Sequence, residues 1–172
     1  MHVESIVATL SIQDGGIDLE SKTKLALVIA GNFSGDEENA DPCSLLNYLP
    51  EDIAGQCQLI EWSCQPSNHY SMKLTTEMEN MFETLVSDGY TGIIVISGSG
   101  VMEEMAYLTD LLWQHPQPVI FANLMVQGRA GLAEGLMNLR CSVQAALSEE
   151  AKDKGVLVCS SGELFAASEV VM

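Results

Sequence analysis

Uninterrupted apolar runs alternate with longer amphipathic stretches along most of this chain. Runs of four to six mainly aliphatic residues are typical of strands buried on both faces of a parallel sheet. On this basis strands are predicted at Leu25–Ala30, Ile93–Ile96, Pro118–Ala122 and Val156–Cys159, with a shorter and more polar one at Gln58–Trp62.

The stretches between these strands carry apolar residues every three or four positions, which is the spacing of one helix face. The predicted faces are Leu74, Met78, Met81, Phe82 and Leu85; Val101, Met105, Leu108 and Leu112; and Leu136, Leu139, Val143 and Leu147. Chain-breaking residues end these helices at Asp88-Gly89, His115-Pro116 and Gly155. A further short helix is predicted from Pro42 to Tyr48, before Pro50.

Three segments do not fit the alternation. Residues 1–23 hold an alternating run from Val3 to Ile12 and a turn at Gln13–Gly16, which predict an N-terminal β-hairpin or arm. Asn123–Gly135 is rich in glycine and long for a connection, which predicts an irregular, functional loop. Leu164–Val171 predicts a short terminal hairpin.

The order of these elements indicates an α/β fold. Parallel strands need crossover helices that pack back onto the sheet, so both faces of the sheet become covered. The predicted architecture is a three-layer α/β/α sandwich with a mainly parallel sheet, preceded by the N-terminal arm or hairpin. A chain of 172 residues can bury a full core without disulfides or metals, so residues 24–172 are predicted to form a single domain.

The charge balance narrows the classes of partner. Seven Lys and Arg residues against 24 Asp and Glu residues give a formal net charge of -17. Phosphate recognition requires clusters of basic residues, so no nucleic acid and no membrane is expected as a partner. We interpret the acidity as a solvated surface rather than as an interaction patch.

The cysteines and the N-terminus bear on cofactors and location. Cys43, Cys57, Cys64, Cys141 and Cys159 include no Cys-x-x-Cys pair and no histidine at zinc-ligand spacing, which predicts free buried thiols and no metal or cofactor. The first residues lack a basic start followed by an apolar block, and no run approaches the ~20 apolar residues of a membrane span. A cytoplasmic location is therefore predicted.

The candidate site follows the strand at Ile93–Ile96, where a Ser/Gly turn opens a helix. Such junctions are where α/β proteins place ligands, and the free N–H groups at a helix start suit a carboxylate or another anion. The candidates for ligand binding are Ser97, Gly98, Ser99 and Gly100. The alternative for Ser99 is that it only caps the helix.

Other loops are expected at the same end of the sheet, because loops that follow neighbouring parallel strands converge there. Ser67 and Asn68 follow the strand at Gln58–Trp62, and Arg129 follows the strand at Pro118–Ala122. Arg129 is a candidate for binding a carboxylate, with a salt bridge between subunits as the alternative. A surface turn is the alternative for Ser67 and Asn68.

From Tyr90 onward the sequence resembles the bacterial L-asparaginases of types I and II. The resemblance rests on Ser97–Tyr107, Gln117–Ile120, Gly135, Asn138-Leu139 and Lys154–Val158, with weaker similarity at Leu45–Pro50 and at Ser67-Asn68 before Met72. It implies the fold of the family's N-terminal domain. It also implies a relation to enzymes that hydrolyse the side-chain amide of asparagine or glutamine.

In that family a nucleophilic threonine attacks the amide, assisted by a second unit of threonine, aspartate and lysine. The resemblance places the nucleophile at Asn32, which has no hydroxyl, and makes Gly31 and Asn32 candidates for ligand binding. It places the aspartate that holds the substrate's amino group at Gly100 and the lysine at Met172, so only Ser99 keeps a hydroxyl. Because such groups act as a unit, the loss of one can cost orders of magnitude in rate.

Two features of the match leave alternatives open. A shifted register would make Ile6–Ile12 the first strand and Thr9 or Ser11 the nucleophile, although Leu10 would then replace a glycine needed for close backbone approach. The family's smaller C-terminal domain, which contributes an acid across the dimer interface, is not among these 172 residues. A natural single-domain relative and a shortened chain are both consistent with this.

Three functional hypotheses follow. The first is an asparaginase-like domain that lacks the family's hydrolytic activity and binds a small amino-acid-like ligand or serves in assembly. The second is an amidohydrolase for asparagine- or glutamine-like amides that uses Ser99 as its catalytic residue, or a hydroxyl near the N-terminus. The third is scaffolding in a larger assembly. The resemblance and the apolar helices also predict a homo-oligomer.

Overall fold

The fold was obtained as a computed structural model, which describes residues 23–31, 42–63, 71–124 and 128–170. The strands are β1 (Leu25–Ala30), β2 (Cys57–Ser63), β3 (Gly92–Ser97), β4 (Val119–Asn123), β5 (Val156–Ser160) and β6 (Glu163–Ala166). The α-helices are α1 (Glu51–Ala54), α2 (Met72–Ser87), α3 (Met102–Leu112) and α4 (Gly128–Ala146). The 3-10 helices in the described part of the chain are η1 (Pro42–Tyr48), η3 (Ser99–Val101) and η4 (Glu149–Ala151).

The described strands form one six-stranded sheet in the order β2-β1-β3-β4-β5-β6. The first five strands run parallel, and β6 pairs antiparallel with β5 at the edge. Every residue of β1 and β3 is buried, which is why both strands read as uninterrupted apolar runs in the sequence. The predicted positions of the five parallel strands are confirmed.

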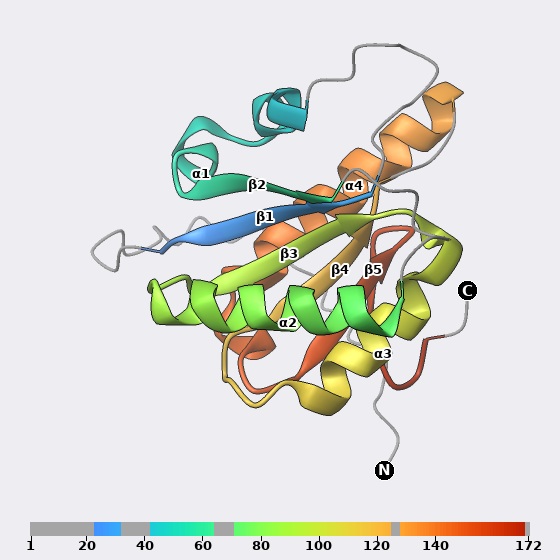
Figure 1. The fold of residues 1–172 in the computed structure, drawn as a ribbon. Helices are drawn as coiled ribbons and strands as arrows, with labels where there is room; N and C mark the ends of the chain where they lie inside the picture. The colour runs from blue at the N-terminus through green and yellow to red at the C-terminus, as the bar shows by residue number, and fades with distance from the viewer. Residues whose placement is uncertain (1–22, 32–41, 64–70, 125–127, 171–172) are drawn as a thin grey trace.

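Helices cover both faces of the sheet (Figure 1). On one face, Met78 and Phe82 of α2 and Met105 of α3 pack with Ile93 and Val95 of β3. On the other face, side chains of α4 and η1 pack with the alternate residues of β3; these side chains are Leu139, Val143 and Leu45, against Ile94 and Ile96. The predicted three-layer α/β/α sandwich with a mainly parallel sheet is therefore confirmed.

The helix α2 agrees with its predicted extent. Ser71 precedes it in an extended conformation, and its hydroxyl accepts a hydrogen bond from the Leu74 N–H at 3.4 Å, as an N-cap does. Phe82 is fully buried and meets the ring of Trp113 edge-on, with 6.2 Å between the ring centroids. The helix ends at Ser87, next to the predicted stop at Asp88-Gly89.

The buried face of α3 differs from the predicted one. The residues at Ser99–Val101 form the 3-10 helix η3, so the α-helical repeat begins only at Met102. A 3-10 turn takes three residues rather than 3.6, which shifts the helix face. Met105 is buried as predicted, but Leu112 is 49% exposed. The side chains that α3 buries are Met102, Met105, Ala106 and Thr109.

The prediction of an irregular loop over Asn123–Gly135 is wrong, because α4 begins at Gly128. Gly135 lies inside this helix and against the end of β4. A Cβ at position 135 would lie 3.1 Å from the carbonyl oxygen of Leu124, so glycine here permits close approach of helix and strand. Gly135 contributed to the prediction of an irregular loop, but in the structure it marks close packing of α4 against the end of β4.

The predicted end of the fourth helix and the predicted position of the terminal hairpin are also wrong. The helix α4 ends at Ala146 rather than at Gly155, and η4 occupies part of the connection to β5. A hairpin was predicted within Leu164–Val171, but the hairpin of the structure is formed by β5 and β6, whose turn lies at Ser161-Gly162. Ser161 and Gly162 both have positive φ, at 52° and 77°, which suits a tight two-residue hairpin turn. The N-terminal arm or hairpin lies outside the described residues.

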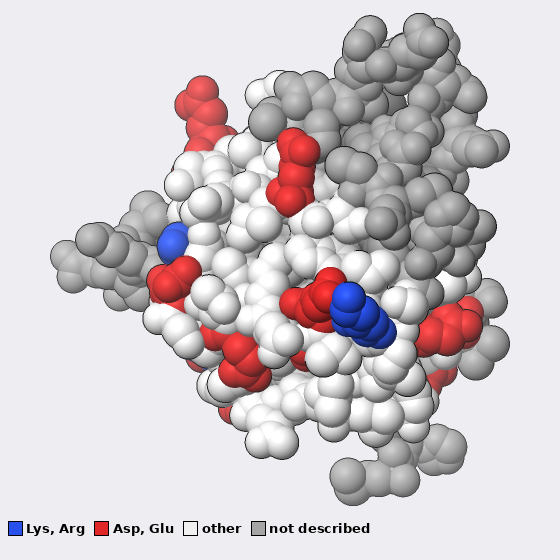
Figure 2. All heavy atoms as spheres, viewed as in Figure 1, with Lys and Arg blue, Asp and Glu red and all other residues white. Residues whose placement is uncertain are grey.

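The visible surface fits the acidic composition. Figure 2 shows Asp and Glu side chains dispersed over the described part of one face, with few Lys or Arg among them. Within the described ranges, no helix is long and apolar enough to cross a membrane.

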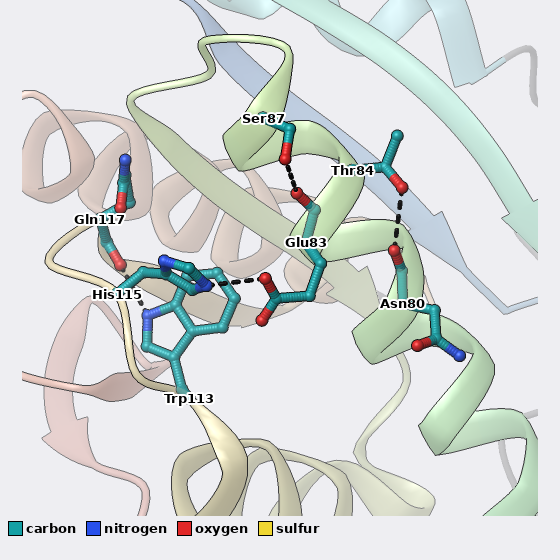
Figure 3. A network of polar contacts seen from close by, with 7 residues as sticks. All are labelled: Asn80, Glu83, Thr84, Ser87, Trp113, His115 and Gln117. Atoms are coloured by element: carbon teal, nitrogen blue, oxygen red, sulfur yellow. Dashed lines mark hydrogen bonds and ion pairs between the residues drawn. The ribbon is translucent and has the colours of Figure 1, made fainter.

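Polar side chains fill one end of the contact between α2 and the loop after α3 (Figure 3). His115 Nε2 lies 2.8 Å from Glu83 Oε2, and the indole of Trp113 donates to the Gln117 carbonyl at 2.9 Å. One helical turn before Glu83, Glu79 has a buried carboxyl oxygen, Oε1, with no hydrogen-bond partner within the described ranges. Burial raises the pKa of Glu79 to about 7, the Thr109 hydroxyl partly offsets this, and the negative charge of Glu83 adds to it.

Replacing Glu79 with glutamine is expected to stabilise the fold above pH 7. The pKa of Glu79 is higher in the folded chain than the ordinary 4.5, so the folded state binds more protons between pH 4.5 and 7 and stability falls as pH rises through that window. At pH 8 we expect Glu79→Gln to raise the free energy of unfolding by about 1 to 2 kcal/mol, after discounting for solvent screening.

Urea unfolding at pH 5 and pH 8 measures this effect, and Glu77→Gln is the matched control. Glu77 lies on the same helix, is half exposed and pairs with Lys73 at 3.5 Å. An exposed pair contributes about 0 to 1 kcal/mol, so its loss should leave the pH dependence unchanged. Equal stability of wild type and Glu79→Gln at pH 8 would contradict the assignment.

Candidate active site

The candidate site lies where β1 and β3 end, side by side in the middle of the sheet. Ala30 at the end of β1 is in register with Ser97 at the end of β3. The chain leaves β1 for β2 on one side, while β3 lies on the other side. Strand order thus reverses at this point, and α/β proteins bind ligands in the crevice that such a reversal opens at the carboxyl ends of the strands.

Gly31 turns the chain out of β1 at this end. Its φ of 146° is a conformation that favours glycine. Its N–H donates to the Ser63 carbonyl at 2.8 Å, which ties the start of the loop to the end of β2. The backbone of Gly31 is therefore held at the carboxyl end of β1, next to the end of β2.

The segment after β3 splits into a buried and an exposed part. Ser97 is fully buried, and its hydroxyl donates to the Gly98 carbonyl at 3.4 Å. Gly98 is also buried, whereas Gly100 is exposed. Ser99, the first residue of η3, thus lies where the chain passes from the buried Gly98 to the exposed Gly100.

The start of α3 follows η3 directly. Its N-cap residue is Val101, which makes no side-chain hydrogen bond. The capping alternative for Ser99 concerns a side chain outside the described part of the structure, so it stays a prediction. Glu103 and Glu104 lie in the first turn, where acids stabilise the helix dipole.

The remaining predicted residues are placed only in part. Arg129 is the second residue of α4, which follows β4 across residues 125–127, so its backbone lies at the same end of the sheet. Asn32, Ser67 and Asn68 lie outside the described residues.

Asn123 is a further candidate at this end of the sheet, and sequence reasoning missed it. It ends β4 in register with Ser97, and its side-chain Oδ1 is buried without a hydrogen-bond partner among the described residues. A buried amide oxygen without a partner is costly, and such groups are common where a ligand or water completes the site. The available signal was a polar residue at the end of an apolar strand, but Asn123 was assigned to the predicted loop instead.

Asn138 holds this end of the sheet together from α4. Its Nδ2 donates to the Asn123 carbonyl at 2.9 Å, and its Oδ1 accepts from the Gly162 N–H at 2.8 Å. Asn138 is fully buried. It therefore joins the end of β4, the helix α4 and the turn between β5 and β6.

The described groups at the candidate site are hydrogen-bonding groups without charge. They are the backbone around Gly98 and Gly100, the Gly31 turn and the Asn123 carboxamide. In the described ranges, no cluster of three or more His, Cys, Asp or Glu side chains is arranged to hold a metal ion. The arrangement can bind the carboxylate or amide of a small ligand through N–H donors.

Comparison with known families decides the relationship. The family described as "Asparaginase, N-terminal" matches residues 28–172. This chain belongs to the asparaginase family. An L-asparaginase from Bacillus licheniformis is 30% identical over 160 residues, which cover 92% of this chain and 48% of that protein. A glutaminase-asparaginase from Pseudomonas fluorescens biotype A is 35% identical over 171 residues, covering 89% and 47%.

The fold comparison gives the same result. The crystal structure of a probable cytoplasmic L-asparaginase from Campylobacter jejuni superposes with a TM-score of 0.77 at 25% identity, covering 87% of this chain and 48% of that one. The family prediction and the fold prediction are confirmed. This asparaginase-family chain spans about half the length of the relatives it matches.

Proposed function

We propose that this asparaginase-family domain binds a small amino-acid-like ligand at the carboxyl ends of β1 and β3 and lacks the hydrolytic chemistry of its relatives. The observation that carries the proposal is Gly100. It is exposed in the turn between β3 and α3, and it supplies no carboxylate at the position where the resemblance expects the aspartate that holds the substrate's amino group.

The binding half of the proposal rests on the geometry that remains. A parallel strand passes through η3 into a helix whose N-cap residue, Val101, makes no side-chain hydrogen bond, and N–H groups at a helix start suit an anionic or amide group. The unpaired Oδ1 of Asn123 supplies an acceptor beside them. A ligand with one carboxylate or amide oxygen and one N–H group matches this set.

The catalytic half rests on three matched positions. Asn32 carries no nucleophilic hydroxyl, Gly100 carries no carboxylate, and Met172 carries no amine. Function follows from the groups in a site rather than from the fold that displays them. Three changes within one catalytic unit argue against hydrolysis by the family's route.

Hydrolysis of asparagine- or glutamine-like amides is the second candidate. The comparisons favour it more directly than the first, because the relatives are named L-asparaginase and glutaminase-asparaginase. Ser99 keeps a hydroxyl in the central turn. In this version Ser99 attacks the amide, and another chain or segment supplies the base that a serine needs. A homo-oligomer and a cytoplasmic location complete both proposals.

A thermal-shift titration tests binding. We expect L-aspartate, L-asparagine and L-glutamine at 10 mM to raise the melting temperature by about 3 to 6 °C, the shift for a dissociation constant near 1 mM in a chain of this size. Because Gly100 cannot hold an amino group, succinate should give a shift similar to that of L-aspartate.

Ser99→Ala and Ser87→Ala form a matched pair for this titration. Ser87 is exposed at the end of α2, so its variant should keep the full shift, whereas Ser99→Ala should reduce it. The proposal is sunk if none of the ligands shifts the melting temperature. A shift in melting temperature with L-aspartate but none with succinate would show that the site binds the amino group, and it would favour the second candidate.

A further inference from the structure

The helix α4 carries a stripe of exposed side chains on the side that faces away from the sheet. It packs Leu139 and Val143 against the sheet, on the face opposite α2 and α3 (Figure 1). The exposed residues of the α4 stripe are Ala133, Met137, Arg140 and Gln144. Their spacing of four, three and four positions is that of helix residues that face a second helix. The pattern of α4 is thus that of a helix with two packing sides, one of which is exposed.

Arg140 in this stripe has no acidic partner within the described ranges. Its Nε donates to the Tyr48 carbonyl oxygen at the end of η1, with 3.2 Å between the two atoms. Acidic residues outnumber basic ones by 24 to seven, yet the ion pairs among the described residues do not include Arg140. Because Arg140 is exposed, its terminal nitrogens can bind a carboxylate of another molecule.

Glu134 supplies a carboxylate beside the same stripe. It lies three residues before Met137, and Arg140 lies three residues after it. Its Oε1 accepts a hydrogen bond from the Ser161 hydroxyl at 3.1 Å, which ties the carboxylate to the turn between β5 and β6. A carboxylate has several acceptor sites, so this bond leaves Glu134 able to bind an arginine. Opposite charges therefore lie equally far along the helix on either side of Met137.

Met137 gives the stripe an apolar centre. A Cβ at Gly162 would lie 3.0 Å from its Sδ, so the Met137 side chain packs closely over the turn between β5 and β6. The side chain is still 46% exposed, and the Tyr48 side chain beside Arg140 is 39% exposed. Methionine, tyrosine and arginine are enriched where proteins contact each other.

We propose that α4 packs antiparallel against α4 of a second copy of this chain, across a twofold axis at Met137. The twofold axis brings Glu134 of each copy level with Arg140 of the other, so the same ion pair forms twice around the two methionines. The charge pattern favours a second copy because the order acid, methionine, arginine is complementary to itself when one helix is reversed. This inference rests on the homo-oligomer of the proposed function and names its surface, but it uses no residue of the candidate ligand site.

Sedimentation equilibrium at physiological salt measures this association. Each copy carries a formal charge of -17, and salt at this level screens charges more than about 8 Å apart. A single helix pair is a small interface, so we expect wild type to pass from monomer to dimer as the concentration rises to about 1 mM. Arg140→Glu and Glu134→Arg each turn two attractions into two repulsions, which should raise the dissociation constant about tenfold or more.

Glu77→Arg is the matched control for Glu134→Arg. It makes the same change of charge at a half-exposed position on α2, so it should leave the dissociation constant unchanged. A wild-type chain that stays monomeric over the whole concentration range would overturn the proposal. A dimer that Arg140→Glu leaves intact would also overturn it, although the homo-oligomer would then stand through another surface.

A mixture of Arg140→Glu with Glu134→Arg tests the twofold pairing directly. In a mixed dimer the two acidic positions of one variant face the two basic positions of the other. The mixture should therefore form a 1:1 dimer at least as tightly as wild type, although neither variant dimerises well alone. Misfolding cannot produce this recovery, and a mixture that stays monomeric would contradict the twofold contact. The thermal-shift titration measures ligand binding separately, so the ligand site can fail without changing this result.

Discussion

Replacing Asn138 with alanine is expected to lower the free energy of unfolding by about 2 to 4 kcal/mol. The carboxamide makes two hydrogen bonds from a fully buried position, one to the Asn123 carbonyl at 2.9 Å and one from the Gly162 N–H at 2.8 Å. Alanine would leave both backbone groups without a partner. Each buried, unpaired polar group costs about 1 to 3 kcal/mol, which exceeds the cost of the small cavity.

Chemical denaturation of Asn138→Ala measures this loss, with Gln144→Ala as the matched control. Gln144 lies on the same helix and is exposed, so its truncation should change stability by less than about 0.5 kcal/mol. Hydrogen exchange should also show faster exchange at Gly162 in Asn138→Ala. If the two variants were equally stable, Asn138 would not be the link that joins α4 to the ends of the sheet.

The strands could be predicted from the sequence because burial on both faces leaves a local signature. In β1 and β3 every side chain is buried, so apolar identity alone marks the strand. The layers followed from the alternation of such strands with amphipathic helices. No distant contact had to be known for this step.

The errors arose where a residue's role depends on a distant neighbour. Gly135 is a turn signal when the sequence is considered alone, but its neighbour in space is the backbone of Leu124, eleven positions earlier in the chain. The face of α3 shifted because η3 is a 3-10 turn, which the spacing of apolar residues does not reveal. Both errors concern geometry that hydrophobic periodicity does not encode.

The candidate site shows the same division. The turn after β3 was predicted because strand, glycine-rich turn and helix are contiguous in the sequence. Asn123 was missed because its closeness to Ser97 depends on the pairing of β3 with β4. Asn138 was noted only as part of the resemblance, since its partners lie 15 and 24 positions away. The roles of Asn32, Ser67, Asn68 and Arg129 stay predictions.

Hydrolysis of asparagine by this chain is expected to be at least about 10³-fold slower than by the related L-asparaginases. Catalytic groups that act as a unit are strongly interdependent, so removing one of them already costs several orders of magnitude. Here the positions matched to the nucleophile, the aspartate and the lysine are Asn32, Gly100 and Met172. A lone Ser99 hydroxyl has no base to take its proton among these three.

An NMR titration with asparagine that is ¹⁵N-labelled in its side-chain amide tests binding and hydrolysis in the same tube. The account predicts that the backbone amides of Gly98, Ser99 and Gly100 shift on addition of the ligand while no labelled ammonium appears. The B. licheniformis enzyme serves as the positive control for ammonium release. Labelled ammonium that forms with wild type and not with Ser99→Ala, or a titration that leaves all three amides unmoved, would contradict it.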